Sequence, residues 1–162
     1  MTSRNQSFEE FWPHYLGEHR HPTSRRLHFL GTTSFVAACA VSTLQSPVRF
    51  PLALCAFGAV FAHGLSREKH GRPLAHVAAM LVAPCAVAPI TFPAGVVAAY
   101  ACAWVGHFQI EGNRPATFQY PLWSLAADFR MWSHMLRGRL WSGDPLEELG
   151  LAGTPASSPA PR

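Results

Sequence analysis

Charged residues are absent from three long stretches of the chain, and apolar residues fill these stretches. They cover residues 27–48, 50–66 and 73–110, which are 22, 17 and 38 residues long. As an α-helix, the first would reach about 33 Å, enough to cross a hydrocarbon core about 30 Å thick, and the second about 25 Å. A helix on the surface of a soluble protein normally has a charged face. The pattern therefore indicates helices that lie in a membrane.

The third stretch is too long for one membrane span, and prolines divide it. Pro89 and Pro93 flank the break, because proline lacks an amide hydrogen and interrupts a helix. Four spans result, at about residues 28–46, 50–66, 74–88 and 94–110. We expect an all-α fold, a membrane-embedded four-helix bundle with up-down-up-down topology, within a single domain of residues 1–152. The alternative is a soluble bundle of very apolar, alanine-rich helices.

Two further helices are expected outside the spans, one at each end of the domain. Ser7 and Glu10 have the spacing of a capping box, which predicts that a helix begins after Ser7. Residues 122–136 have the apolar and polar positions of an amphipathic helix. We expect both to be amphipathic interfacial helices. The tail 153–162 is rich in Pro, Ala and Ser and is expected to be disordered.

Basic residues are distributed unevenly between the two predicted membrane sides. Twelve of the 13 Lys and Arg residues fall on the side that holds both termini, and only Arg49 falls on the other. By the positive-inside rule, the first side is cytoplasmic. We therefore expect an integral membrane protein with both termini in the cytoplasm. Its location would be a bacterial inner membrane or, in a eukaryote, the endoplasmic reticulum.

Composition limits the classes of function. Charged residues make up 14% of the chain, against about 25% in a typical soluble domain. The net charge of +4 permits nucleic-acid binding but does not establish it, and we expect no nucleic acid among the partners. The four cysteines lie singly in apolar stretches, without C-x-x-C spacing. We therefore interpret them as packing residues and not as disulfides or zinc ligands.

All nine histidines fall on or near the predicted cytoplasmic side. Neutral imidazole is a common metal ligand, and an ionisable residue in a membrane helix is costly unless it has a partner. His28 opens the first span, His107 lies near the end of the fourth, and His63 near the end of the second could complete a ligand set. Two simpler roles remain open. His28 would be a hydrated interfacial residue, and His107 would be a core residue bonded to Glu111, its neighbour at i+4 on the same helix face.

Polar residues near these histidines are candidates for supporting roles. Glu111 could accept a hydrogen bond from His107 and so fix its tautomer. Arg25, Arg26 and Arg114 offer the paired N–H groups that bind a carboxylate. For Arg25 and Arg26, setting the topology and contacting lipid headgroups is an equal alternative.

Two motifs flank the predicted spans. Tyr15, His19, Pro22, His28 and Gly31 match the first, a Tyr, His, Pro pattern that ends in His-x-x-Gly. The second reads V-G-H-x-x-x-E and then basic-Pro-Ala, and it is matched by Val105, Gly106, His107, Glu111, Arg114, Pro115 and Ala116. This pair of motifs resembles that of the membrane-embedded 2-hydroxy fatty acid dioxygenases of fatty-acid α-oxidation. The resemblance covers residues 8–140, and Ser24 departs from it because many members have Asn there.

The resemblance implies an iron(II) enzyme that uses O2 to convert a long-chain 2-hydroxy fatty acid into the fatty acid one carbon shorter. The implied iron ligands are His19, His28 and His107, with His63 as a weaker fourth candidate. Glu111 would be a ligand or a base in contact with a ligand, and Arg114 would pair with the substrate carboxylate. The acyl tail would lie between apolar helices, among membrane lipid.

Two other classes of function compete with this one. A non-enzymatic membrane scaffold or small carrier would leave the histidines as interfacial residues without a metal. A haem protein or a di-iron lipid hydroxylase would be a different oxidase. The H-x-x-H-H clusters that are typical of di-iron hydroxylases are absent from the chain.

Overall fold

The computed structural model describes residues 4–152, and every regular element in that range is helical. The expected all-α class is therefore confirmed for this range, while the predicted disordered tail lies outside the described residues. The elements in chain order are α1 (Phe8–Gly17), α2 (Pro22–Gln45), α3 (Arg49–Leu65), the 3-10 turn η1 (Glu68–His70), α4 (Leu74–Val87), α5 (Thr91–Val105), the π-helical segment η2 (Gly106–Glu111), the 3-10 turn η3 (Ala116–Phe118), α6 (Pro121–Leu136) and α7 (Pro145–Glu148).

Local sequence signals account for where the helices begin. The Ser7 side chain accepts a hydrogen bond from the Glu10 amide at 3.2 Å and so caps α1, as the capping box predicts. Pro22 stands in the first turn of α2, where its missing amide hydrogen has no cost. Helix α2 begins several residues before the predicted span 28–46. The span started too late because Arg25 and Arg26, which interrupt the charge-free stretch, lie within the helix.

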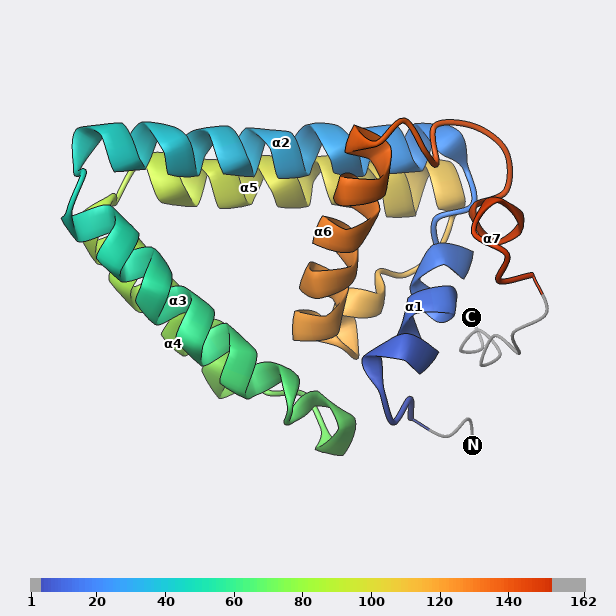
Figure 1. Ribbon diagram of the computed structural model, residues 1–162, viewed down its shortest axis with the longest axis horizontal. Coiled ribbons are helices and arrows are strands. Elements are labelled where there is room, and N and C mark those ends of the chain that lie inside the picture. The colour runs from blue at the N-terminus through green and yellow to red at the C-terminus, as the bar shows by residue number, and fades with distance from the viewer. Residues whose placement is uncertain (1–3, 153–162) are drawn as a thin grey trace.

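The four long apolar helices form two pairs that diverge from a common corner (Figure 1). In one pair α2 runs beside α5, and in the other α3 runs beside α4. At the corner, Phe50, Ala88 and Phe92 form a small buried core, and Ser42 shares a hydrogen bond with Thr91 at 2.6 Å. The arrangement therefore differs from the expected four-helix bundle, since the pairs contact each other chiefly at this corner.

Helix α6 lies between the diverging pairs, near their open ends (Figure 1). The buried carboxylate of Glu68, just after α3, accepts hydrogen bonds from the amides of Leu122 and Trp123 at the start of α6. Further along α6, the Trp132 indole donates to Thr33 of α2 at 3.0 Å. The helix is thus hydrogen-bonded to both pairs and occupies the space between them.

The main hydrophobic core lies between α1 and α6, outside the two pairs. Aromatic rings dominate it, with Phe11 in contact with Tyr120 and Trp123 at centroid distances of 4.9 and 5.8 Å. Met131 and Met135 of α6 are also buried there. The amphipathic character expected of the two flanking helices is present, but their apolar faces bury each other.

The outer faces of the helix pairs are apolar and exposed. Leu44 and Leu52 are exposed near the corner, and Ile90 is exposed at the start of α5. Within residues 4–152, α2 alone has both the length (24 residues) and the apolar character needed to cross a membrane, by length and composition only. Helices α3 and α4 are apolar but shorter.

Candidate metal centre

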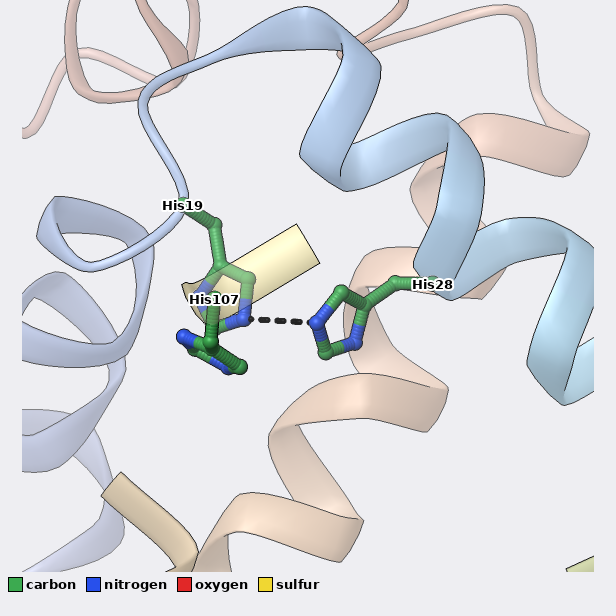
Figure 2. Close-up of side chains that lie close together, drawn as sticks. All are labelled: His19, His28 and His107. Atoms are coloured by element: carbon green, nitrogen blue, oxygen red, sulfur yellow. Dashed lines mark hydrogen bonds between the residues drawn. The ribbon is translucent and has the colours of Figure 1, made fainter. Parts of the chain in front are cut away.

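Three histidines from distant parts of the sequence meet in the protein interior (Figure 2). His19 lies in the loop between α1 and α2, His28 lies in α2, and His107 lies in the π-helical segment after α5. One ring nitrogen from each lies within 4.8 Å of the others, and each side chain is at most 7% exposed. This is the one cluster of potential metal ligands in residues 4–152.

The Nδ1 atom of each ring faces an oxygen that only accepts hydrogen bonds. His19 Nδ1 lies 2.6 Å from the Tyr15 carbonyl oxygen, His28 Nδ1 lies 2.6 Å from a carboxylate oxygen of Asp128, and His107 Nδ1 lies 2.7 Å from Oδ1 of Asn113. In each ring the proton therefore belongs on Nδ1. The three Nε2 atoms are left with free lone pairs, which is the state a metal requires.

The unprotonated Nε2 atoms of His19 and His28 are 3.2 Å apart (Figure 2). With both protons on Nδ1, no hydrogen lies between these two atoms, and their lone pairs repel. Protonating one ring would relieve the repulsion, but burial, as the largest cause, holds the pKa of His19 well below its usual value. A cation bound between the nitrogens would satisfy all three lone pairs.

Asp128 of α6 connects the centre to the surrounding helices. Its carboxylate accepts hydrogen bonds from His28, from the Tyr15 hydroxyl at 3.1 Å and from the Thr32 hydroxyl. Burial first, and then the Asp128 charge, raise the pKa of Tyr15 well above its usual value, so that Tyr15 remains a neutral donor. The orientation of His28 is therefore fixed by a network that spans α1, α2 and α6.

The chain positions His107 by changing its helical winding. The π-helical segment begins at Gly106, where a Cβ atom would lie 2.9 Å from the buried Ser24 hydroxyl. Gly112 follows the segment, and its φ of 65° is a left-handed conformation that favours glycine. The next residue, Asn113, donates from Nδ2 to the Glu18 carbonyl at 2.8 Å, which leaves its Oδ1 facing His107.

Arg25 holds the loop that contains His19. Its guanidinium is fully buried and donates to five carbonyl oxygens, including those of His19, Arg20 and Leu140. These hydrogen bonds connect the loop to the segment that follows α6. Arg25 is therefore a structural residue, whereas Arg26 is exposed and donates to the Trp141 carbonyl.

A cavity of about 90 Å³ adjoins the centre and is lined by the rings of His28 and His107. Most of its other walls are apolar or aromatic, with Ala99 and Ala103 of α5 on one side and Leu125 of α6 on another. No Lys or Arg of residues 4–152 lines this cavity. The centre therefore faces a small, largely apolar space.

Three of the residues predicted from sequence lie elsewhere. His63 of α3 does not join the cluster. Its Nδ1 lies instead 2.9 Å from Nε2 of His76 on the paired helix α4. Arg114 is exposed, with its guanidinium 5.8 Å from the centre of the Phe118 ring, and it does not line the cavity.

Glu111 is also separated from its expected partner. Its carboxylate accepts a hydrogen bond from the His21 amide at 2.9 Å, and Asn113 takes its place beside His107. The reason is the π-helical winding, since residues at i and i+4 share a face in an α-helix but not in a wider helix.

Sequence reasoning missed Asp128 and Asn113 as partners of the histidines. Asn113 follows Gly112 just after the fourth predicted span, and Asn is common at the ends of helices for backbone reasons alone. Asp128 lies 100 residues from His28, and its only signal was an acidic group in a helix with a largely apolar face.

Comparison with known protein families gives a match that covers the residues of this centre. A family model described as 2-hydroxy-palmitic acid dioxygenase Mpo1-like matches residues 5–140. No curated protein and no solved structure matches the chain. The matched range contains all three histidines and both Asp128 and Asn113. The family assignment expected from the motifs is therefore confirmed, and the chain belongs to the Mpo1-like family.

Proposed function

We propose that this protein is an iron(II)-dependent dioxygenase. It would cleave long-chain 2-hydroxy fatty acids to the fatty acid one carbon shorter, as in α-oxidation. The family description supports the substrate class and the use of O2. The observation that supports metal-dependent chemistry is the convergence of three unprotonated imidazole nitrogens in a buried site beside a cavity.

The donor atoms fit ferrous iron. Imidazole nitrogen suits iron, and three protein ligands leave coordination positions open for O2 and substrate. His19, His28 and His107 would hold the ion, and no carboxylate belongs to the cluster. Bound iron(II) would supply the redox chemistry that O2 requires, and a 2-hydroxy acid could chelate it through its carboxylate and hydroxyl oxygens.

The protein's own residues orient the ligands and exclude water. The Tyr15 carbonyl, Asp128 and Asn113 hold the three ring tautomers, so that no proton must leave the rings when a cation binds. The apolar cavity walls receive the first carbons of the substrate. The remainder of the acyl chain leaves toward the apolar outer faces of the helices, where burial contributes about 0.8 kcal/mol per CH2.

The overall reaction balances with one O2 per turnover. The substrate R–CH(OH)–COOH and O2 together give the products R–COOH, CO2 and H2O. The C1–C2 bond breaks, C2 is oxidised to the new carboxyl carbon, and O2 is reduced. No external reductant is needed under this balance.

Turnover of 2-hydroxypalmitate tests the proposed activity. Protein purified in detergent and supplied with iron(II) under air should form pentadecanoate and consume an equimolar amount of O2, while palmitate, which lacks the 2-hydroxyl, should be unchanged. A folded, iron-loaded preparation that yields no shortened acid, beside an active control enzyme, would contradict the proposal.

We also propose that the helix pairs cross a membrane, with the corner on the side opposite the histidines. The exposed apolar residues of these pairs and the concentration of basic residues at the other end support this placement. Single cysteines introduced as Pro47→Cys at the corner and Lys69→Cys after α3 test it, in a background with the native cysteines replaced. In right-side-out bacterial membrane vesicles, a maleimide that cannot cross the membrane should label position 47 only. Labelling of both positions, or of position 69 alone, would contradict this topology.

A further inference from the structure

Ser124 of α6 is a buried hydroxyl without a hydrogen-bond partner. The residue is 4% exposed, and its Oγ contacts no donor or acceptor among the described residues. Serine and threonine in helices usually return their hydroxyl to a carbonyl one turn earlier. Ser34, Thr43 and Ser133 do so in this protein, at 2.8 to 2.9 Å. Leaving a polar group unsatisfied in the interior has a cost, so the departure at Ser124 requires an explanation.

The position of Ser124 supplies one, because the residue lines the cavity beside His28 and His107. The other buried polar groups of this wall are already engaged. The hydroxyls of Tyr15 and Thr32 donate to Asp128, whose carboxylate accepts from both and from His28. Ser124 is thus the one buried hydroxyl lining the cavity that has no partner within residues 4–152.

The charge of the cavity indicates what such a donor is for. The proposed substrate brings a carboxylate, yet no Lys or Arg in the described part of the chain lines the cavity, and Arg114 lies outside it. Asp128 adds negative charge to the wall. Besides a bound metal ion, a carboxylate entering this space needs neutral hydrogen-bond donors.

We propose that the Ser124 hydroxyl donates a hydrogen bond to the carboxylate of the 2-hydroxy acid, and that it is a substrate-binding residue of this site. This inference rests on the proposed function. It also predicts an unusual combination of effects. Removing the hydroxyl should weaken substrate binding and leave the ligand-free protein at least as stable as before, because no bond within the protein is lost.

The test compares Ser124→Ala with Ser133→Ala, which removes a hydroxyl from the same helix at a position that does not line the cavity. Binding is measured by calorimetry without oxygen, on the full-length iron(II)-loaded protein. The two probes are 2-hydroxyoctanoate and octane-1,2-diol, which has a CH2OH group in place of the carboxylate. Thermal melting of the ligand-free proteins is measured in parallel.

We expect Ser124→Ala to bind 2-hydroxyoctanoate about tenfold more weakly than the wild type, since a hydrogen bond to a charged group is lost. Its affinity for the diol and its melting temperature should not fall. Ser133→Ala loses the hydrogen bond to the Arg130 carbonyl, but it should bind both probes as tightly as the wild type. Unchanged affinity of Ser124→Ala for the acid would overturn the inference, as would equal losses for acid and diol or a lower melting temperature. A wild-type protein that binds neither probe would instead refute the proposed function, and the inference with it.

Discussion

At the residue scale, three chemically different acceptors set the tautomers of the three histidines. A backbone carbonyl faces His19, a carboxylate faces His28, and a side-chain amide faces His107. The result in each case is the same, a proton on Nδ1 and a free lone pair on Nε2. Sequence motifs could indicate these histidines, but the direction of each ring depends on partners that only the folded chain brings close.

Asp128 is the residue whose loss should affect the centre most without removing a ligand. Asp128→Asn removes the negative charge of the group that accepts from His28 Nδ1, so that the hydrogen bond that orients this ring becomes weaker. We expect iron(II) or cobalt(II) affinity to fall about 10- to 100-fold, as measured by competition with a chelator. Glu9→Gln is the matched control, because Glu9 is an exposed carboxylate of α1 that pairs with Arg130. Equal metal affinity of the Asp128 and Glu9 variants would contradict this role.

At the element scale, the helix bounds could be predicted but the packing angles could not. Charges and prolines lie near the ends of α2 to α5, and each predicted span overlaps one of these helices, with ends that differ by up to six residues. The divergence of the two pairs depends instead on long-range contacts, above all those of Glu68 with the start of α6. The π-helical winding at His107 likewise gave no signal in a pattern that assumed 3.6 residues per turn.

Close contact between α2 and α5 requires glycine at position 95. A Cβ atom there would lie 2.5 Å from Cβ of Ala38, and neither atom can rotate away. Gly95→Ala should therefore lower the free energy of unfolding by about 1–3 kcal/mol. Gly58→Ala in α3, where a Cβ atom meets nothing within 4 Å, should raise it by about 0.5–1 kcal/mol. Unfolding in a detergent titration measures both, and equal stability of the two variants would contradict the packing described here.

Glu68 makes the anchoring of α6 sensitive to pH. Burial raises its pKa to about 7 from 4.5, although the amides of Leu122 and Trp123 and the charge of Arg4 act in the opposite direction. Between these values the folded state holds a proton that the unfolded state has lost, so stability falls as the pH rises through this window.

The variant Glu68→Gln removes this titration and keeps an oxygen that can accept from both amides. Relative to it, the wild type should lose up to about 3 kcal/mol of unfolding free energy between pH 4.5 and pH 7.5. Chemical unfolding across this range measures the difference. Parallel stability curves for the two proteins would show that Glu68 does not titrate as described.

At the scale of the whole molecule, the fold collects His19, His28 and His107 at the end of the α2–α5 pair, where α1 and α6 cover them. The uneven distribution of charge predicted that the histidines share one side of the molecule. It could not separate His63 from the others, because His63 belongs to the pair that diverges from α2 and α5. The end of the molecule at which a histidine lies can be predicted from local sequence, whereas its membership of the cluster depends on how the helix pairs diverge.

The metal content of purified protein tests most directly whether the three histidines form one iron site. The wild type, reconstituted with iron(II) and freed of excess metal, should retain about one iron ion per chain by elemental analysis. His107→Ala should lose it, and His63→Ala, which removes an imidazole outside the cluster, should retain it. Iron retained equally by the wild type and His107→Ala, or iron absent from the folded wild type, would contradict the account.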